Sequence, residues 1–266
     1  MRKLFIISLV LLFSFFALAL FLSPTLAKND KDSENEEQII PEQDGTYDVP
    51  GHPEMKVRVF VHKARPEPAP LPLLTCGLSD PESNAVVDPL AYHLPTDKAW
   101  TYQLNPSSAP SSVRSNLSIF AADAFSRWTS ASGNKVSFIK GSDTLTSRKA
   151  LDGKNIIAWG RISGSALGIT YMWYYPSTGL MAETDTIMNT KFVWSWTPYN
   201  KNNLCAVANT YDAQDILTHE LGHWMGLNDE YATDYADNTM FGYGSKSEVK
   251  KDTLTDGDIS GINKIY

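Results

Sequence analysis

The 266-residue sequence has little cysteine, no excess of basic residues and no internal repeat. Its two cysteines, Cys76 and Cys205, allow at most one intramolecular disulfide. Lysine and arginine total 23 against 30 aspartate and glutamate residues, which gives a net charge of −7. Because the chain lacks the positive charge that nucleic-acid phosphates attract, we expect no nucleic-acid partner. Its 42% apolar and 20% charged residues are typical of a globular protein that can bury a core.

A long apolar run lies at the amino terminus. Arg2 and Lys3 precede the uncharged residues 4–22, and a proline and small residues follow. This pattern predicts a secretory signal peptide over residues 1–27, and therefore a secreted, extracellular protein. An uncleaved membrane anchor is the alternative, because the run approaches the length that spans a bilayer; otherwise we expect no stable membrane association. No cysteine follows the run, which argues against lipid attachment there.

Residues 28–75 are predicted to be an acidic and proline-rich pro-segment or linker. Residues 28–48 contain too few apolar groups to offset the entropy of ordering. Residues 55–64 alternate valines with polar residues, which predicts one short strand. The stretch "RPEPAPLPLL" then supplies four prolines in ten residues and reads as a stiff connector. The sequence leaves open whether this segment inhibits, tethers or only spaces the domain that follows.

Residues 76–266 have the periodicity of a packed α/β domain. One helix is expected within residues 111–133, a second over about 212–225, and a third at the carboxyl end, where Thr255 and Asp258 form a capping-box pattern. Strands are expected at residues 99–105, 135–140, 155–160, 168–175 and 182–189.

Two histidines on the second expected helix carry the clearest chemical signal. His219 and His223 are four residues apart in "HELGHWMGLND", so both imidazoles face one side of a helix and can reach one metal ion. Glu220 stands beside the first of them, where a general base would be needed next to the open side of that ion. The alternative is two ordinary helix histidines, but chance rarely produces this spacing with this glutamate.

The third metal ligand is predicted to be Asp229. Gly226 can turn the backbone sharply at the end of the helix, and the carboxylate three residues later can return to a zinc ion. Glu230 is a competing ligand, and Glu248 would complete a site of the type that uses a distant glutamate. Neither explains Gly226 as well.

The run "HELGHWMGLND" resembles the extended zinc motif of the metzincin peptidases, and "DNTMFGYG" is similar to their Met-turn, with Met240 beneath the metal. The closing helix and the strands upstream resemble those of the matrixins, the matrix-metalloprotease-like branch, in the microbial type with Asp as third zinc ligand. The resemblance covers residues 97–266. It implies an α/β (α+β) fold with a twisted, mostly parallel five-stranded sheet, three helices and a small lower subdomain.

The resemblance also implies a reaction and a place for its substrate. A matrixin-like peptidase hydrolyses peptide bonds with a zinc-activated water, and Glu220 would be its general base. An extended peptide would bind along the edge strand at Ala166, Leu167 and Gly168 through main-chain hydrogen bonds.

The chain departs from the family pattern in two ways. Asp229 stands where a third histidine is usual, and the ligands of the matrixin structural zinc are missing. The remaining histidines are therefore interpreted as solvated or packing residues: His52, His62 and His93. Acids such as Asp152 and Asp185 are candidate calcium ligands, although surface acids without a metal are the simpler interpretation.

The stretch "TCGLSD" partly resembles the Cys-Gly-x-Pro-Asp switch of matrixin pro-segments, whose thiolate caps the zinc. Thr75 and Ser79 replace the usual Arg and Pro, and Cys205 lies just before the zinc helix. We therefore favour a disulfide between Cys76 and Cys205 over a cysteine switch.

These features predict a secreted, monomeric zinc endopeptidase that acts on peptides or proteins. Two alternatives remain at this stage. The domain could be a catalytically silent, secreted binding domain that keeps zinc for structure, or a zinc peptidase whose third ligand is Glu248.

Overall fold

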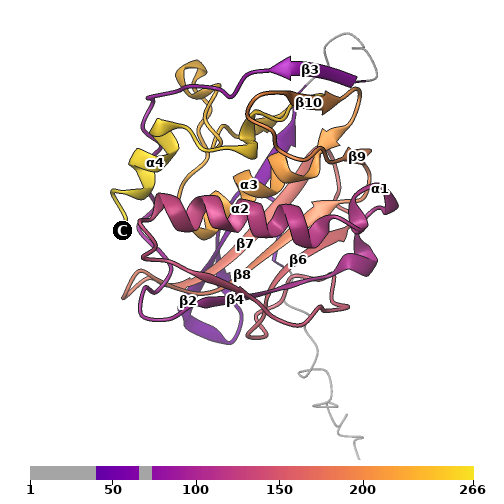
Figure 1. Ribbon diagram of the computed structural model, residues 1–266. Coiled ribbons are helices and arrows are strands. Elements are labelled where there is room, and N and C mark those ends of the chain that lie inside the picture. Colours follow the sequence, from indigo (N-terminus) through magenta and orange to yellow (C-terminus); the bar gives the residue numbers. More distant parts are fainter. Residues whose placement is uncertain (1–39, 66–73) are drawn as a thin grey trace, which may run out of the picture. The chain divides into compact units, whose positions relative to one another are not determined.

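The computed structural model describes residues 40–65 and 74–266 (Figure 1). The predicted signal peptide and most of the expected acidic spacer lie outside these residues. Within the two described ranges, no helix has the length and apolar character needed to cross a bilayer.

The helices form where the sequence predicts them. They are α1 (Ser111–Arg114), α2 (Leu117–Ala131), α3 (Ala213–Trp224) and α4 (Asp256–Ile262), with short 3₁₀ turns at Pro106–Ser108, Thr233–Tyr235 and Lys250–Asp252. The Asp212 carboxylate caps α3 by accepting hydrogen bonds from the backbone N–H groups of Gln214 and Asp215. The expected capping box of Thr255 and Asp258 starts α4.

The main sheet contains most of the strands. They are β1 (Gly45–Val49), β2 (His52–Ala64), β4 (Trp100–Leu104), β5 (Phe138–Lys140), β6 (Asn155–Gly160), β7 (Ala166–Tyr175), β8 (Leu180–Asn189) and β12 (Tyr243–Gly244). Two small sheets lie apart from it, one of β3 (Leu74–Leu78) with β10 (Leu204–Val207) and one of β9 (Trp194–Ser195) with β11 (Tyr211–Asp212).

The strand order is β1-β2-β7-β8-β6-β4-β5, and β12 pairs with β2. Strands β4, β5, β6 and β8 run parallel, and β7 is antiparallel to β8. These five strands are the mostly parallel five-stranded sheet that the sequence predicts. The mixed α/β fold is therefore confirmed, and the chain adds further strands to it.

The added strands change the position of β7, which the sequence analysis expected at an edge. Strand β2 pairs antiparallel with β7 from Lys56 to Lys63, so β7 lies inside the sheet. The segment 28–75 was expected to precede the domain as a pro-segment or linker, yet its residues from 40 onward belong to the same compact unit, residues 38–266. A strand whose two faces are both apolar in its second half is stable only when both faces are covered.

The sheet separates two hydrophobic cores. The helices α2, α3 and α4 pack on one face, where their apolar residues join Phe60 of β2 (Figure 1). On the other face, Met55, Val57, Val59 and Val61 of β2 join residues of β6, β7 and β8. Because side chains alternate along a strand, this arrangement turns Phe60 and His62 toward α3.

A disulfide joins Cys76 to Cys205 across β3 and β10. It ties the start of the family-like region to the segment just before α3. With its sulfur in this bond, Cys76 has no thiolate to offer a metal ion.

Candidate metal centre

Helix α3 presents two buried imidazoles in a fixed orientation. The Nδ1 atom of His219 lies 2.8 Å from the carbonyl oxygen of Thr239, and that of His223 lies 3.0 Å from the carbonyl oxygen of Leu227. A carbonyl only accepts, so the ring proton of each histidine belongs on Nδ1. Each Nε2 then carries a free lone pair, as a metal-binding imidazole requires.

The turn after α3 returns Asp229 to these imidazoles. Gly226 adopts φ 91°, and a Cβ there would lie 2.7 Å from the carbonyl oxygen of Tyr92, so only glycine fits. The Oδ1 atom of Asp229 lies 3.2 Å from Nε2 of His219 and 3.6 Å from Nε2 of His223. The structure thus brings together the three predicted ligands.

These three atoms fit a zinc ion. All three are buried, and none has a hydrogen-bond partner in the structure: Nε2 of His219, Nε2 of His223 and Oδ1 of Asp229. Ligands about 2.0–2.1 Å from a tetrahedral zinc ion would lie about 3.3 Å apart, which agrees with the separations between the carboxylate and the two imidazoles. Unpaired buried polar atoms are costly, and a shared cation would satisfy all of them.

Burial also sets the protonation of the ligands. It lowers the pKa of His223 to about 3 and lowers the pKa of His219 well below its ordinary value, so both rings are neutral at pH 7. Neutral imidazole is the form that binds metals. Burial raises the pKa of the Asp229 carboxyl, because nothing but a cation would compensate a charge in this position.

Glu220 is held from one side only. The Oγ1 atom of Thr170 donates to its Oε2 at 2.6 Å, and Thr170 in turn lies 2.7 Å from the hydroxyl of Thr186, which accepts from the indole N–H of Trp224. The other oxygen, Oε1, has no partner. Burial raises the pKa of this carboxyl to about 8. A Cβ at Gly168 would lie 2.7 Å from Oε1, so the glycine leaves room for it.

Met240 lies directly beneath α3. A Cβ on Gly222 would come within 2.1 Å of its sulfur, so the helix and the methionine pack closely at this point. The Asp258 carboxylate of α4 accepts hydrogen bonds from the backbone N–H groups of Thr239 and Met240, which fixes the turn that carries the methionine.

The competing ligands lie elsewhere. Glu230 accepts a hydrogen bond from the backbone N–H of Asp88, and Glu248 accepts one from Ser245 and pairs with Lys250. Among residues 40–65 and 74–266, both groups of side chains able to share a metal ion lie at this one centre.

The candidate calcium ligands have other partners. Asp185 accepts backbone N–H bonds from Ala150 and Ile156, and Asp152 pairs with Lys154. They hold the loop before β6 and are not grouped as metal ligands.

Sequence reasoning missed Phe60 and His62 of β2. The Phe60 ring stacks on His223 with centroids 3.8 Å apart, and the His62 ring lies 3.8 Å from that of His219 at an angle of 51°. His62 is fully buried and shares a second potential metal group with His219 and Glu220, so it packs as expected but at the centre itself. The alternation of residues 55–64 could have placed both side chains on one face, but not beside α3.

The other two histidines outside α3 lie away from the centre. His52 is exposed, and the Nδ1 atom of His93 lies 2.9 Å from the carbonyl oxygen of Leu94.

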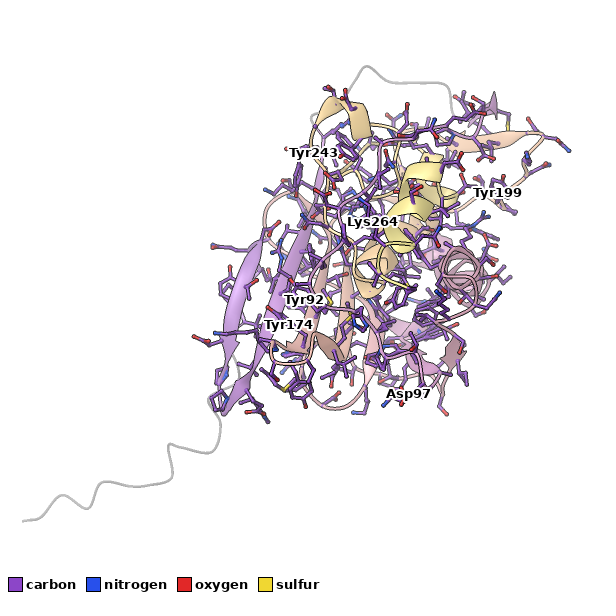
Figure 2. All side chains as sticks on the ribbon, turned by 90° about the vertical axis from the view of Figure 1, so that its left-hand side faces the viewer. Tyr92, Asp97, Tyr174, Tyr199, Tyr243 and Lys264 are labelled. Atoms are coloured by element: carbon purple, nitrogen blue, oxygen red, sulfur yellow. A yellow bond between two sulfur atoms is a disulfide. The ribbon has the colours of Figure 1, made fainter. Side chains whose placement is uncertain are left out.

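Strand β2 closes the metal centre. With it in place, the side chains of His219, Glu220 and His223 are fully buried. Figure 2 shows the β1–β2 hairpin along the outer edge of the sheet, with Tyr92 beside Tyr174 of β7. The described structure is therefore a closed form of the site.

A single zinc position with two imidazoles and a carboxylate, next to a further carboxylate that is not a ligand, defines the class of zinc-dependent hydrolases. The comparison with family models narrows this class. The matrixin model matches residues 93–266, and the chain belongs to the matrixin family of zinc metallopeptidases. No curated protein matches the sequence.

Proposed function

We propose that this chain is a secreted zinc endopeptidase in which His219, His223 and Asp229 hold the zinc and Glu220 is the general base. The observation that carries the proposal is the convergence of three unpartnered buried ligand atoms beside the free Oε1 of Glu220. When bound, zinc supplies a Lewis acid for the scissile carbonyl and acidifies a water.

The residues of the chain divide the remaining work. Glu220 accepts the proton of the attacking water at Oε1 and delivers it to the leaving amine. Thr170 holds Oε2 and so fixes the direction in which Oε1 points. The raised pKa of this carboxyl, about 8, suits a group that must both take and give a proton near neutral pH.

The intact chain is a latent form in this proposal. The place expected for an extended substrate, along β7 at residues 166–168, is filled by β2, whose His62 lies opposite Gly168. A substrate can enter only after β2 has left. The closed site also favours the alternative of a catalytically silent zinc-binding domain, although such a site needs no glutamate in the position of Glu220.

The test uses the full chain with a recognition sequence for an unrelated protease placed within residues 66–73. Cut and uncut samples are incubated with an unfolded protein substrate. The cut sample should cleave it, stop with a chelator, recover with zinc, and lose activity in Glu220→Ala with zinc still bound. A cut, zinc-loaded sample that cleaves nothing would contradict the peptidase assignment.

Latency is tested separately in the uncut chain. Phe60→Ala combined with His62→Ala should raise activity, because both changes weaken the packing of β2 on α3. Lys63→Ala, at an exposed position of the same strand, is the matched control and should leave activity low. Equal activity of the uncut and cut wild-type chains would exclude latency but leave the peptidase assignment intact.

A further inference from the structure

Strand β2 occupies a slot with two backbone walls. On one side it pairs with β7, and the backbone N–H of Ala64 donates to the carbonyl of Ser165 at 2.9 Å. On the other side it pairs with β12, and the N–H of Arg65 donates to the carbonyl of Gly244 at 2.9 Å. Main-chain hydrogen bonds from both walls set the register of any extended chain in this slot.

The register sends one side chain into a closed polar pocket. His62 lies opposite Gly168 and points toward α3, where the Nζ atom of Lys251 lies 3.1 Å from its Nε2. An ammonium only donates, so Nε2 of His62 is the acceptor. The pocket thus holds a hydrogen-bond acceptor at its end.

Lys251 is built to offer that one contact. Its side chain is fully buried, and Nζ also donates to the carbonyls of Phe241, at 2.5 Å, and Tyr243, at 3.0 Å. An ammonium has three N–H donors, so two belong to the main chain and the third faces the side chain opposite Gly168. Among the residues that the structure describes, no carboxylate forms an ion pair with this Nζ.

We propose that Lys251 is a specificity residue that selects peptides with a hydrogen-bond acceptor, a carboxylate or a side-chain amide, at the position opposite Gly168. The proposal rests on the proposed function, because it assumes that a substrate replaces β2 in the same slot. An apolar side chain there would leave a buried N–H of Lys251 without a partner, and sites built around such a donor reject analogues that lack the acceptor.

The experiment measures binding before it measures catalysis. Peptides with the sequence of residues 56–65, "KVRVFVHKAR", carry Glu, Gln or Leu in place of the histidine and a fluorescent label. They are titrated against the cut full chain in the Glu220→Ala background. The displaced hairpin competes equally with each peptide, so ratios of apparent Kd report the preference of the pocket.

We expect the Glu and Gln peptides to bind about tenfold more tightly than the Leu peptide. In Lys251→Met this ratio should fall to about one. The matched control places Glu or Leu at the neighbouring exposed position, that of Lys63, and should change the apparent Kd little.

Two results would overturn the proposal: a Leu peptide that binds as tightly as the Glu and Gln peptides when Lys251 is present, or no binding by any peptide. If Lys251→Met does not fold, the wild-type peptide series decides alone. A binding preference that persists while the cut, zinc-loaded wild-type chain hydrolyses no peptide would contradict the peptidase assignment and leave the role of Lys251 standing.

Discussion

At the scale of single residues, the metal centre depends on groups that would be unfavourable without a shared ion. Asp229 is the clearest of these, since its buried Oδ1 faces two imidazole nitrogens and has no hydrogen-bond partner. A residue in this position contributes to metal binding first and to the fold second.

Asp229→Ala should lower zinc affinity by more than about 100-fold, because it removes one of three ligands, and even residues that only orient ligands contribute 10- to 100-fold. Competition against a chromophoric chelator measures the affinity. Glu230→Gln is the matched control, since Glu230 binds the backbone of Asp88 instead. Unchanged affinity in Asp229→Ala would rule out this aspartate as a ligand.

Thr170 acts through Glu220 as a positioning residue. Thr170→Val keeps the shape of the side chain but removes the hydroxyl that donates to Oε2. We expect kcat of the cut chain to fall about 10- to 100-fold with little change in KM or zinc affinity. Thr170→Ser should restore most of the loss. A KM effect alone would show that the threonine serves substrate binding.

At the scale of elements, α4 supports the metal centre from a distance. The Asp258 carboxylate accepts hydrogen bonds from the backbone N–H groups of Thr239, Met240 and Thr255 and from the hydroxyl of Thr255. The same carboxylate therefore caps the helix and fixes the turn beneath α3.

Asp258→Ala should lower the free energy of unfolding by about 2–4 kcal/mol, because it removes the cap and leaves buried donors unpaired. Asp256→Ala, an exposed change in the same helix turn, should cost no more than about 1 kcal/mol. Urea unfolding of both variants measures the difference. Equal losses would show that the carboxylate acts only through the charge of the first turn.

The loop before β6 makes stability depend on pH. Burial raises the pKa of Glu183 to about 7 and that of Asp185 well above its ordinary value. Between pH 4.5 and 7 the folded chain therefore binds more protons at Glu183 than the unfolded chain, so this group makes the free energy of unfolding fall as pH rises.

Glu183→Gln should flatten that fall in part, since Asp185 still titrates. Urea unfolding at pH 5 and pH 8 gives the comparison. An unchanged difference between the two pH values would mean that the backbone N–H bonds to Glu183 keep its carboxylate charged in the folded state.

At the scale of the whole molecule, the disulfide closes the largest loop. Cys76 and Cys205 are separated by 129 residues, and the chain-entropy estimate for that length is about 4–5 kcal/mol. The double variant Cys76→Ser/Cys205→Ser should therefore unfold at a clearly lower urea concentration than the wild type. A variant of unchanged stability would mean that the unfolded chain is already compact.

The sequence by itself determined the zinc helix, its glutamate, the returning aspartate and the capping box of α4. Each of these follows from residues close together along the chain, where the 3.6-residue repeat, a glycine turn and a side-chain cap decide the local structure. The family resemblance added the order of the five strands, which local periodicity could not supply.

Only the tertiary structure decided what covers the site. The alternation of residues 55–64 predicts a strand, but a strand carries no local signal for its partner, and β2 pairs with β7 more than 100 residues away. Phe60, His62 and Lys251 therefore reach α3 through long-range pairing. For the same reason the metal centre, exposed to substrate in the sequence-based picture, is closed in the folded chain.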